Sequence, residues 1–95
     1  MEALLTAVKL AMRIKTEAYD HGIIQLIEAA LFDLGVVGVI ADSDTTDPLI
    51  IQAVKTYCRL NFGTPSDYDR LKASYEEQKA QLISCTGYGL PSEEG

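Results

Sequence analysis

The sequence predicts an all-α fold: a small four-helix bundle with a long loop between helices 2 and 3 and an extended C-terminal tail. Two observations support this prediction. In four separate segments, apolar residues recur at every third or fourth position, which is the spacing of one face of a helix. Glycine, proline and capping residues, which begin and end helices, stand between those segments. The 95 residues are enough for one small domain, and we assign residues 1–83 to the helical bundle and residues 84–95 to the tail.

The first two helices are predicted from their apolar stripes. The first spans about residues 2–14, and the second begins between residues 16 and 20 and ends at Leu34. Gly35 is expected to be the left-handed residue after the second helix, because glycine adopts that conformation without steric cost. The stripes consist of Leu4, Leu5, Val8, Ala11 and Met12 in the first helix and of Ile23, Leu26, Ile27, Ala30, Leu31 and Leu34 in the second.

The last two helices are predicted from their N-terminal signals. Asp47 is suited to cap the third helix, and Pro48 suits its first position because no hydrogen-bond donor is needed there. Gly63 ends that helix. Thr64 is expected to cap the fourth helix, which reaches about residue 83, and Asp67 stands at the capping-box position. The core predicted from all four helices contains Leu5, Val8, Met12, Ile23, Ile27, Leu31, Ile50, Val54, Tyr57 and Leu71.

Two segments are predicted to be non-helical, and we expect them to carry the partner contacts. Residues 35–47 begin apolar and end acidic, and so long a loop in a small domain is usually functional or mobile. An exposed β-branched run from Val36 to Ile40 is an aggregation hazard, so we expect a neighbour to protect it, for example by strand addition. The tail from Ser84 contains three glycines and a proline and cannot continue a helix. It is expected either to order on binding or to be a frayed terminus without a role.

Charge and composition favour some classes of protein over others. Eight Lys and Arg against fourteen Asp and Glu give a formal net charge of −6, which disfavours tight binding to nucleic-acid phosphates. No apolar run approaches about 18 residues, so no membrane span is expected. The N-terminal residues lack a basic segment, so we expect no secretory signal. Cys58 and Cys85 do not have the spacing of a metal or redox pair, which makes a reducing compartment the default expectation.

Catalytic and metal-binding patterns are weak, and we expect neither an enzyme nor a cofactor. The single histidine, His21, has no orienting partner fixed by spacing, so the sequence does not indicate nucleophilic catalysis. No Cys and His pairs have the spacing of a metal site. Asp42 and Asp44 resemble part of a calcium loop, but the glycine and the terminal glutamate of such a loop are missing.

Two helical faces indicate contacts beyond the core. Phe32 is expected to point away from the apolar stripe of the second helix, beside Gln25 and Glu28, so we propose these three as subunit-interface residues. The long loop is an alternative cover for Phe32, and a single exposed aromatic residue also occurs by chance. The fourth helix has a narrow seam, which fits either a lid over the other helices or a contact with another subunit. The seam consists of Tyr68, Leu71, Tyr75, Gln78 and Leu82.

The order of these elements resembles the head–tail connector proteins of long-tailed bacteriophages, also called portal adaptor or head-completion proteins. The opening helix LLTAVKLAMRI and the second helix IIQLIEAALFDL are similar to those of the family. The segment DSDTTDPLIIQAVKTYCRLNFG resembles the acidic loop and third helix of the family. The segment DYDRLKASYEEQKAQLISCTGYG resembles the closing helix and tail of the family. The chain departs from the family just before the second helix, where Tyr19, Asp20, His21 and Gly22 replace a more acidic segment.

The resemblance implies a structural protein of the virion that assembles in the host cytoplasm. It implies a homo-oligomeric ring of about twelve copies under the portal protein, which extends the DNA channel and docks the next head-completion or tail protein. The loop with Asp42 and Asp44 would face the channel, where acidic side chains let DNA pass without sequence-specific binding. The tail would clamp the portal through Thr86, Gly87, Tyr88, Gly89 and Leu90.

Two other functions remain open at the level of the sequence. One is a small helical binding module or regulator whose grooves accept a partner helix. The other is a DNA-binding helix-turn-helix domain, because one face of the third helix combines polar and basic residues as a recognition helix does. That face consists of Gln52, Lys55, Thr56 and Arg59. The acidity of the whole chain argues against this last function.

Overall fold

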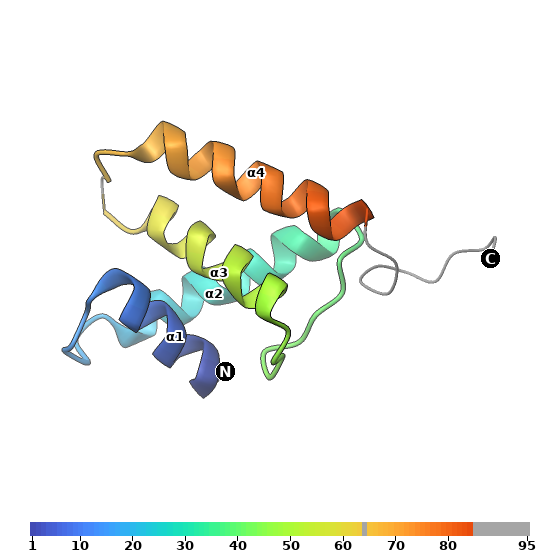
Figure 1. Ribbon diagram of the computed structural model, residues 1–95. Coiled ribbons are helices and arrows are strands. Elements are labelled where there is room, and N and C mark those ends of the chain that lie inside the picture. The colour runs from blue at the N-terminus through green and yellow to red at the C-terminus, as the bar shows by residue number, and fades with distance from the viewer. Residues whose placement is uncertain (64, 85–95) are drawn as a thin grey trace.

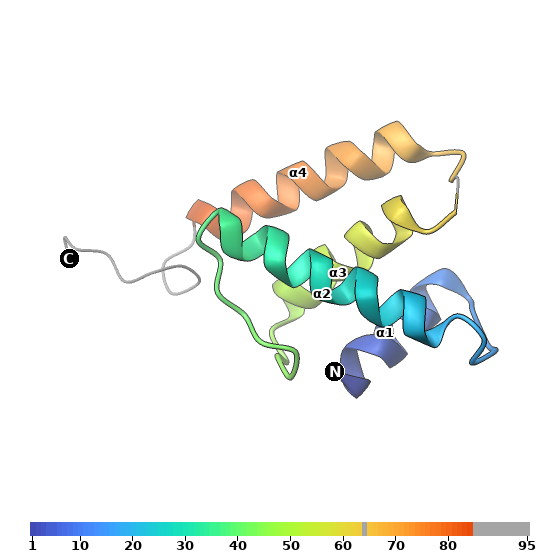
Figure 2. The same ribbon diagram turned by 180° about the vertical axis from the view of Figure 1, so that it is seen from behind.

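A computed structural model of the chain describes residues 1–63 and 65–84, which form four helices and no strand (Figures 1 and 2). The all-α prediction is confirmed. The helices are α1 (Glu2–Met12), α2 (Asp20–Val36), α3 (Pro48–Asn61) and α4 (Tyr68–Ser84). In Figure 1, α4 lies along one side of α3, α1 lies on the other side, and α2 crosses behind. The predicted tail and its residues 86–90 lie outside the described part of the chain.

Helix α3 is the centre of the fold because it packs against each of the other three helices. Its apolar residues cover most of the helix circumference, and only a narrow stripe with Gln52 and Arg59 is exposed. Helix α4 packs mainly against α3, so its predicted seam lies inside the molecule at Leu71, Tyr75 and Leu82. Tyr68, at the start of the same seam, remains half-exposed.

The predicted core is correct at six positions and shifted at four. Val8, Ile23, Ile27, Ile50, Val54 and Leu71 are buried, whereas Leu5, Met12, Leu31 and Tyr57 are only partly buried and pack at the edge of the core. In α1, Leu4 takes the place predicted for Leu5. Leu4 and Val8 are four residues apart and point the same way, whereas Leu5 is rotated by about 100° toward the surface.

The predicted caps are found at the start of α3. Asp47 accepts a hydrogen bond from the backbone N–H of Leu49 at 2.9 Å, and Pro48 occupies the first turn. Thr64, the predicted cap of the fourth helix, lies outside the described residues, and α4 begins only at Tyr68. The first helix ends earlier than predicted. At the C-terminus of α1, Arg13 adopts a left-handed conformation with φ 59°, so the helix ends at Met12 rather than at residue 14.

The C-terminus of α2 is not where the sequence predicts it. Gly35 lies within the helix, and the left-handed residue is Gly38, with φ +93°. The N–H of Gly38 donates to the carbonyl of Gly35 at 3.0 Å, and the N–H of Val39 donates to that of Leu34 at 2.9 Å. These two bonds form a Schellman motif, and its usual apolar contact is available because Val39 and Leu34 are fully buried.

The same motif corrects the prediction of an exposed β-branched run. Val36 belongs to α2 and Val39 is buried, so this segment is neither extended nor uniformly exposed. An added strand on a neighbouring molecule would have to break the helix end, because the motif uses the N–H groups of Gly38 and Val39. Exposed apolar side chains remain at Val36, Val37 and Ile40.

The two glycines at this helix end predict opposite effects of alanine. Gly35→Ala should raise the free energy of unfolding by about 0.5–1 kcal/mol, because alanine is the better helix residue. Gly38→Ala should lower it by about 1–2 kcal/mol, because a left-handed backbone is strained for alanine. An added Cβ meets no atom within 4 Å at either position, so the contrast isolates the backbone effect. Urea unfolding of both variants checks the signs, and equal shifts would contradict the assignment.

Candidate interaction surfaces

The outer face of α2 carries large apolar side chains that no other described element covers. This face consists of His21, Gln25, Glu28, Phe32 and Val36, all of which are at least partly exposed. Phe32 is 75% exposed and Val36 68% exposed, while Ile27 and Leu34 on the opposite side of the helix are fully buried. The predicted orientation of Phe32 is therefore found. Because α2 has apolar residues on both sides, its outer face is suited to burial against another molecule.

A polar network fixes the last turns of α2 against α4. Asp33 accepts hydrogen bonds from the hydroxyl of Tyr75 at 2.6 Å and from Nζ of Lys79 at 3.2 Å. Nζ of Lys79 also lies 5.1 Å from the centre of the Tyr75 ring, and the Tyr57 ring meets the same ring edge to face. The hydrogen bond from Tyr75, followed by the contact with Lys79, lowers the pKa of Asp33. Burial and the bond to Asp33 raise the pKa of Tyr75, so this hydroxyl stays a donor.

This network predicts a pH-dependent contribution to stability. Because the pKa of Asp33 is lower in the folded state, its contribution to stability is present above the unfolded pKa of about 3.8 and is lost as pH falls through the folded pKa. Asp33→Asn should reduce the free energy of unfolding by about 0.5–1 kcal/mol at neutral pH, since the carboxylate is partly exposed. In urea titrations, this deficit should shrink below about pH 4. If the loss of unfolding free energy is constant down to pH 2, the ionised Asp33 carboxylate is not its cause. The same conclusion follows if the exposed control Glu77→Gln shows an equal loss.

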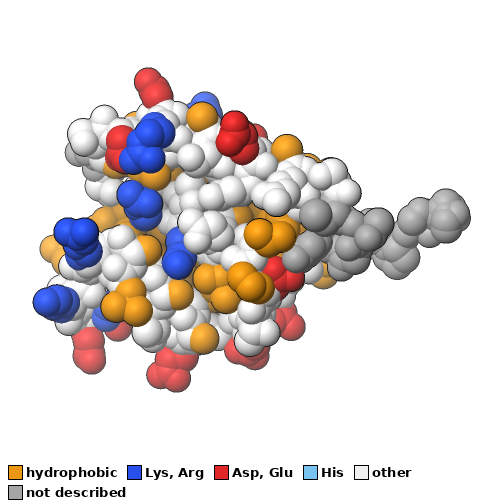
Figure 3. All heavy atoms as spheres, viewed as in Figure 1, with side chains coloured by type: hydrophobic (Ala, Val, Ile, Leu, Met, Phe, Trp, Pro, Cys, Tyr) orange, Lys and Arg blue, Asp and Glu red, His pale blue; other side chains and the backbone are white. Residues whose placement is uncertain are grey.

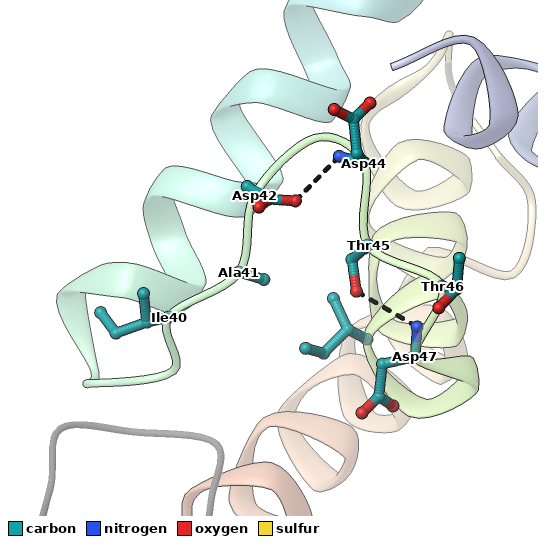
Figure 4. Close-up of a pocket in the computed structure, with 8 residues that line it drawn as sticks. Ile40, Ala41, Asp42, Asp44, Thr45, Thr46 and Asp47 are labelled. Atoms are coloured by element: carbon teal, nitrogen blue, oxygen red, sulfur yellow. Dashed lines mark hydrogen bonds between the residues drawn. The ribbon is translucent and has the colours of Figure 1, made fainter.

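The loop between α2 and α3 follows a path held by local hydrogen bonds (Figure 4). The Asp42 carboxylate accepts from the N–H of Asp44 at 3.0 Å, and the Thr45 hydroxyl accepts from the N–H of Asp47 at 3.2 Å. The N-terminal ammonium pairs with Asp44 at 2.9 Å, which ties the loop to the start of α1. An open cavity of about 530 Å³ lies along the loop. Asp42 and Asp44 are both exposed, as a channel-facing role requires, and this role remains a prediction.

The exposed stripe of α3 differs from a recognition helix. Gln52 and Arg59 are exposed and Lys55 is partly exposed, but Thr56 is only 4% exposed. The Thr56 hydroxyl donates to the carbonyl of Gln52 at 3.0 Å within the helix. The residue predicted to share the polar face therefore belongs to the interior, because α3 is covered on three sides by the other helices.

Other chemistry is sparse in the described part of the chain. Residues 1–63 and 65–84 contain no group of three or more His, Cys, Asp and Glu side chains placed to hold a metal ion. No helix within these residues is both long enough and apolar enough to cross a membrane. Cys58 is buried, and burial raises the pKa of its thiol to about 12, so its thiolate form is disfavoured and its role is packing.

Comparison with known proteins gives one family. Residues 4–88 match the family model described as phage connector protein. The chain belongs to the phage connector protein family. No curated protein and no solved structure matches the chain. A connector is a structural part of the phage particle, which implies contacts with other head or tail proteins.

The connector fold separates the predicted site residues into distinct regions. Gln25, Glu28 and Phe32 share the outer face of α2, and Asp42 and Asp44 share the loop. The predicted portal-binding residues 86–90 lie outside the described part of the connector.

Sequence reasoning misses two features of the connector surface. One is the network of Asp33, Tyr75 and Lys79. Its signal in the sequence is that Tyr75 and Lys79 are four residues apart on one face of α4, while Asp33 lies at the edge of the apolar stripe of α2. The other is Leu10, which is 74% exposed although it lies in an apolar helix. The stripe of α1 is narrow, and Leu10 falls outside it.

Proposed function

We propose that this connector forms a closed ring of about twelve copies beneath the phage portal protein. The ring extends the DNA channel and presents a docking surface for the next head-completion or tail protein. The observation that carries the proposal is the family match over residues 4–88, which includes nearly all of the four helices. The role is structural, without catalysis or a cofactor. The protein works in the virion and assembles in the host cytoplasm.

Three regions of the chain take three roles in this proposal. The outer face of α2, with Gln25, Glu28 and Phe32, contacts the neighbouring subunit, which is supported by the exposure of Phe32. The loop with Asp42 and Asp44 faces the DNA channel, where its acidic side chains offer no cation for phosphates to bind. The tail clamps the portal through residues 86–90, among which Tyr88 and Leu90 supply side chains that fill pockets on the partner.

Truncation after Ser84 tests the role of the tail. Because α1 to α4 all end by Ser84, the truncated chain should keep its helical circular dichroism and its unfolding midpoint. Binding to portal-containing heads should fall at least tenfold, which corresponds to about 1.4 kcal/mol or more. A truncated chain that joins the heads as well as the full chain would show that the tail is not the anchor.

Deletion of residues 42–46 tests the loop separately. This deletion removes Asp42 and Asp44 and none of the residues of the tail or of the outer face of α2. Attachment to the portal should be retained, while retention of DNA or docking of the next protein should change. If portal attachment is lost while DNA retention is normal in the heads that still carry the chain, the loop contacts the portal and does not line the channel.

A further inference from the structure

The outer face of α2 presents an aromatic residue and an acid that are matched by a second surface on the same molecule. Phe32 and Glu28 are four residues apart, so they are neighbours on the helix. Phe32 is 75% exposed, and Glu28 forms no ion pair within the described residues. Phe is among the residues enriched in protein interfaces, and a charge that meets an opposite charge across an interface fixes its register.

The second surface is a depression of about 220 Å³ at the end of the bundle away from the C-terminus of α2. It lies where α1 and α3 end and α4 begins, and it is lined by Met12, Arg59, Phe62, Pro65, Asp67 and Leu71. Four of these six side chains are apolar. Asp67 is neutralised by its ion pair with Arg70, whereas Arg59 is exposed and forms no ion pair within the described residues.

Lys and Arg side chains without an ion pair lie in the segments around this depression, together with some acidic side chains (Figure 3). Lys and Arg side chains gather on the left half of the molecule in Figure 3, over the ends of α1 and α3 and the start of α4, which are identified in Figure 1. Besides Arg59, the side chains of Arg13, Lys15, Lys55 and Lys72 also form no ion pair within the described part of the chain. An incoming acidic side chain would therefore be attracted to this end.

We propose that Phe32 and Glu28 of one copy dock at this depression on the next copy, with Phe32 against its apolar wall and Glu28 paired with Arg59. The two surfaces cannot meet within one chain, because the last turns of α2 and the depression lie at opposite ends of the bundle in both views (Figures 1 and 2). The contact is therefore head-to-tail, and such contacts close into a ring when the rotation between copies fits. This inference rests on the proposed ring and specifies its subunit contact.

A charge exchange between the two surfaces tests the contact. Glu28→Arg alone places two arginines opposite each other, and Arg59→Glu alone places two glutamates opposite each other. Each variant should therefore associate with itself at least tenfold more weakly than the wild type at low salt. In an equimolar mixture of the two variants, every contact between unlike copies again joins one arginine to one glutamate. The mixture should recover association to within about threefold of the wild type. Native mass spectrometry and sedimentation velocity measure both quantities.

Two controls establish that the charge exchange acts through this contact. Both changed residues lie at the surface, so circular dichroism should show an intact fold. Glu77→Arg on α4 provides the same change of charge as Glu28→Arg, away from either surface. If the wild type assembles and both single variants assemble as well as Glu77→Arg does, the proposed contact is wrong. The same conclusion follows if the mixture shows no recovery. Neither result contradicts the proposed ring. If the wild type does not assemble in solution or on portal-containing heads, the proposed function itself fails.

Discussion

Phe32→Ala is expected to leave the isolated chain folded and to weaken assembly by about 1–3 kcal/mol at each subunit interface. The side chain is 75% exposed, so its removal takes almost no buried contact from the monomer. Alanine is also a better helix residue than phenylalanine, so the unfolding midpoint should stay constant or rise slightly. In a ring, every subunit loses the contact on both of its sides, and complete rings should become rare at concentrations where the wild type closes.

Leu10→Ala is the matched control for this prediction. Leu10 is 74% exposed, almost the same as Phe32, but it lies on α1 and outside both proposed contact surfaces. Light scattering across a dilution series should separate the two variants. A clear loss of monomer stability in Phe32→Ala with unchanged assembly would mean that Phe32 belongs to the core. An equal loss of assembly in Leu10→Ala would mean that assembly does not depend specifically on Phe32.

Leu34→Ala should have the opposite result, although Leu34 lies only two residues further along α2. Its side chain is fully buried in the core, so truncation should reduce the free energy of unfolding by about 2–5 kcal/mol through lost burial and a residual cavity. The change also removes the apolar contact of the Schellman motif with Val39. Small domains have a total stability of about 5–15 kcal/mol. If the stability of the wild type is near about 5 kcal/mol, this loss leaves a sizeable fraction of the molecules unfolded.

Chemical denaturation of both α2 variants measures the contrast directly. Leu34→Ala should lower the urea midpoint strongly with a similar slope, and any loss of assembly should follow from the loss of folded monomer. A loss below about 1 kcal/mol would mean that the core relaxes into the vacated space or that Leu34 is not central to it.

The features that follow from local chemistry are predicted well. Asp47 and Pro48 begin α3 as expected, because a capping side chain and a first-turn proline need no information from distant residues. The stripe of α2 also places Phe32 correctly, since helical geometry alone separates it from Ile27 and Leu34. Long-range packing decides the rest.

The end of α2 illustrates what the sequence leaves open. Gly35 and Gly38 are both suitable left-handed residues, and the choice depends on Val39, which enters the core only if the helix continues to Val36. The network of Asp33, Tyr75 and Lys79 likewise depends on how α2 and α4 approach each other, which no local pattern specifies.

The candidate contact surface shows the same division. An exposed Phe32 is predictable from α2 alone, but the depression that complements it is built from α1, α3 and α4 together. Met12 and Leu71 are far apart in the sequence, and only the packing of α1 and α4 against α3 brings them to the same wall. The sequence therefore predicts half of the proposed contact, and the fold supplies the other half.

The number of copies bound to each portal distinguishes a closed ring from scattered attachment. Purified chain is mixed with portal-containing heads, unbound chain is removed, and the copies per portal are counted by quantitative mass spectrometry and electron microscopy. We expect a closed ring of about twelve copies beneath each portal. Heads that carry no chain, or scattered copies without a ring at the portal, would contradict it.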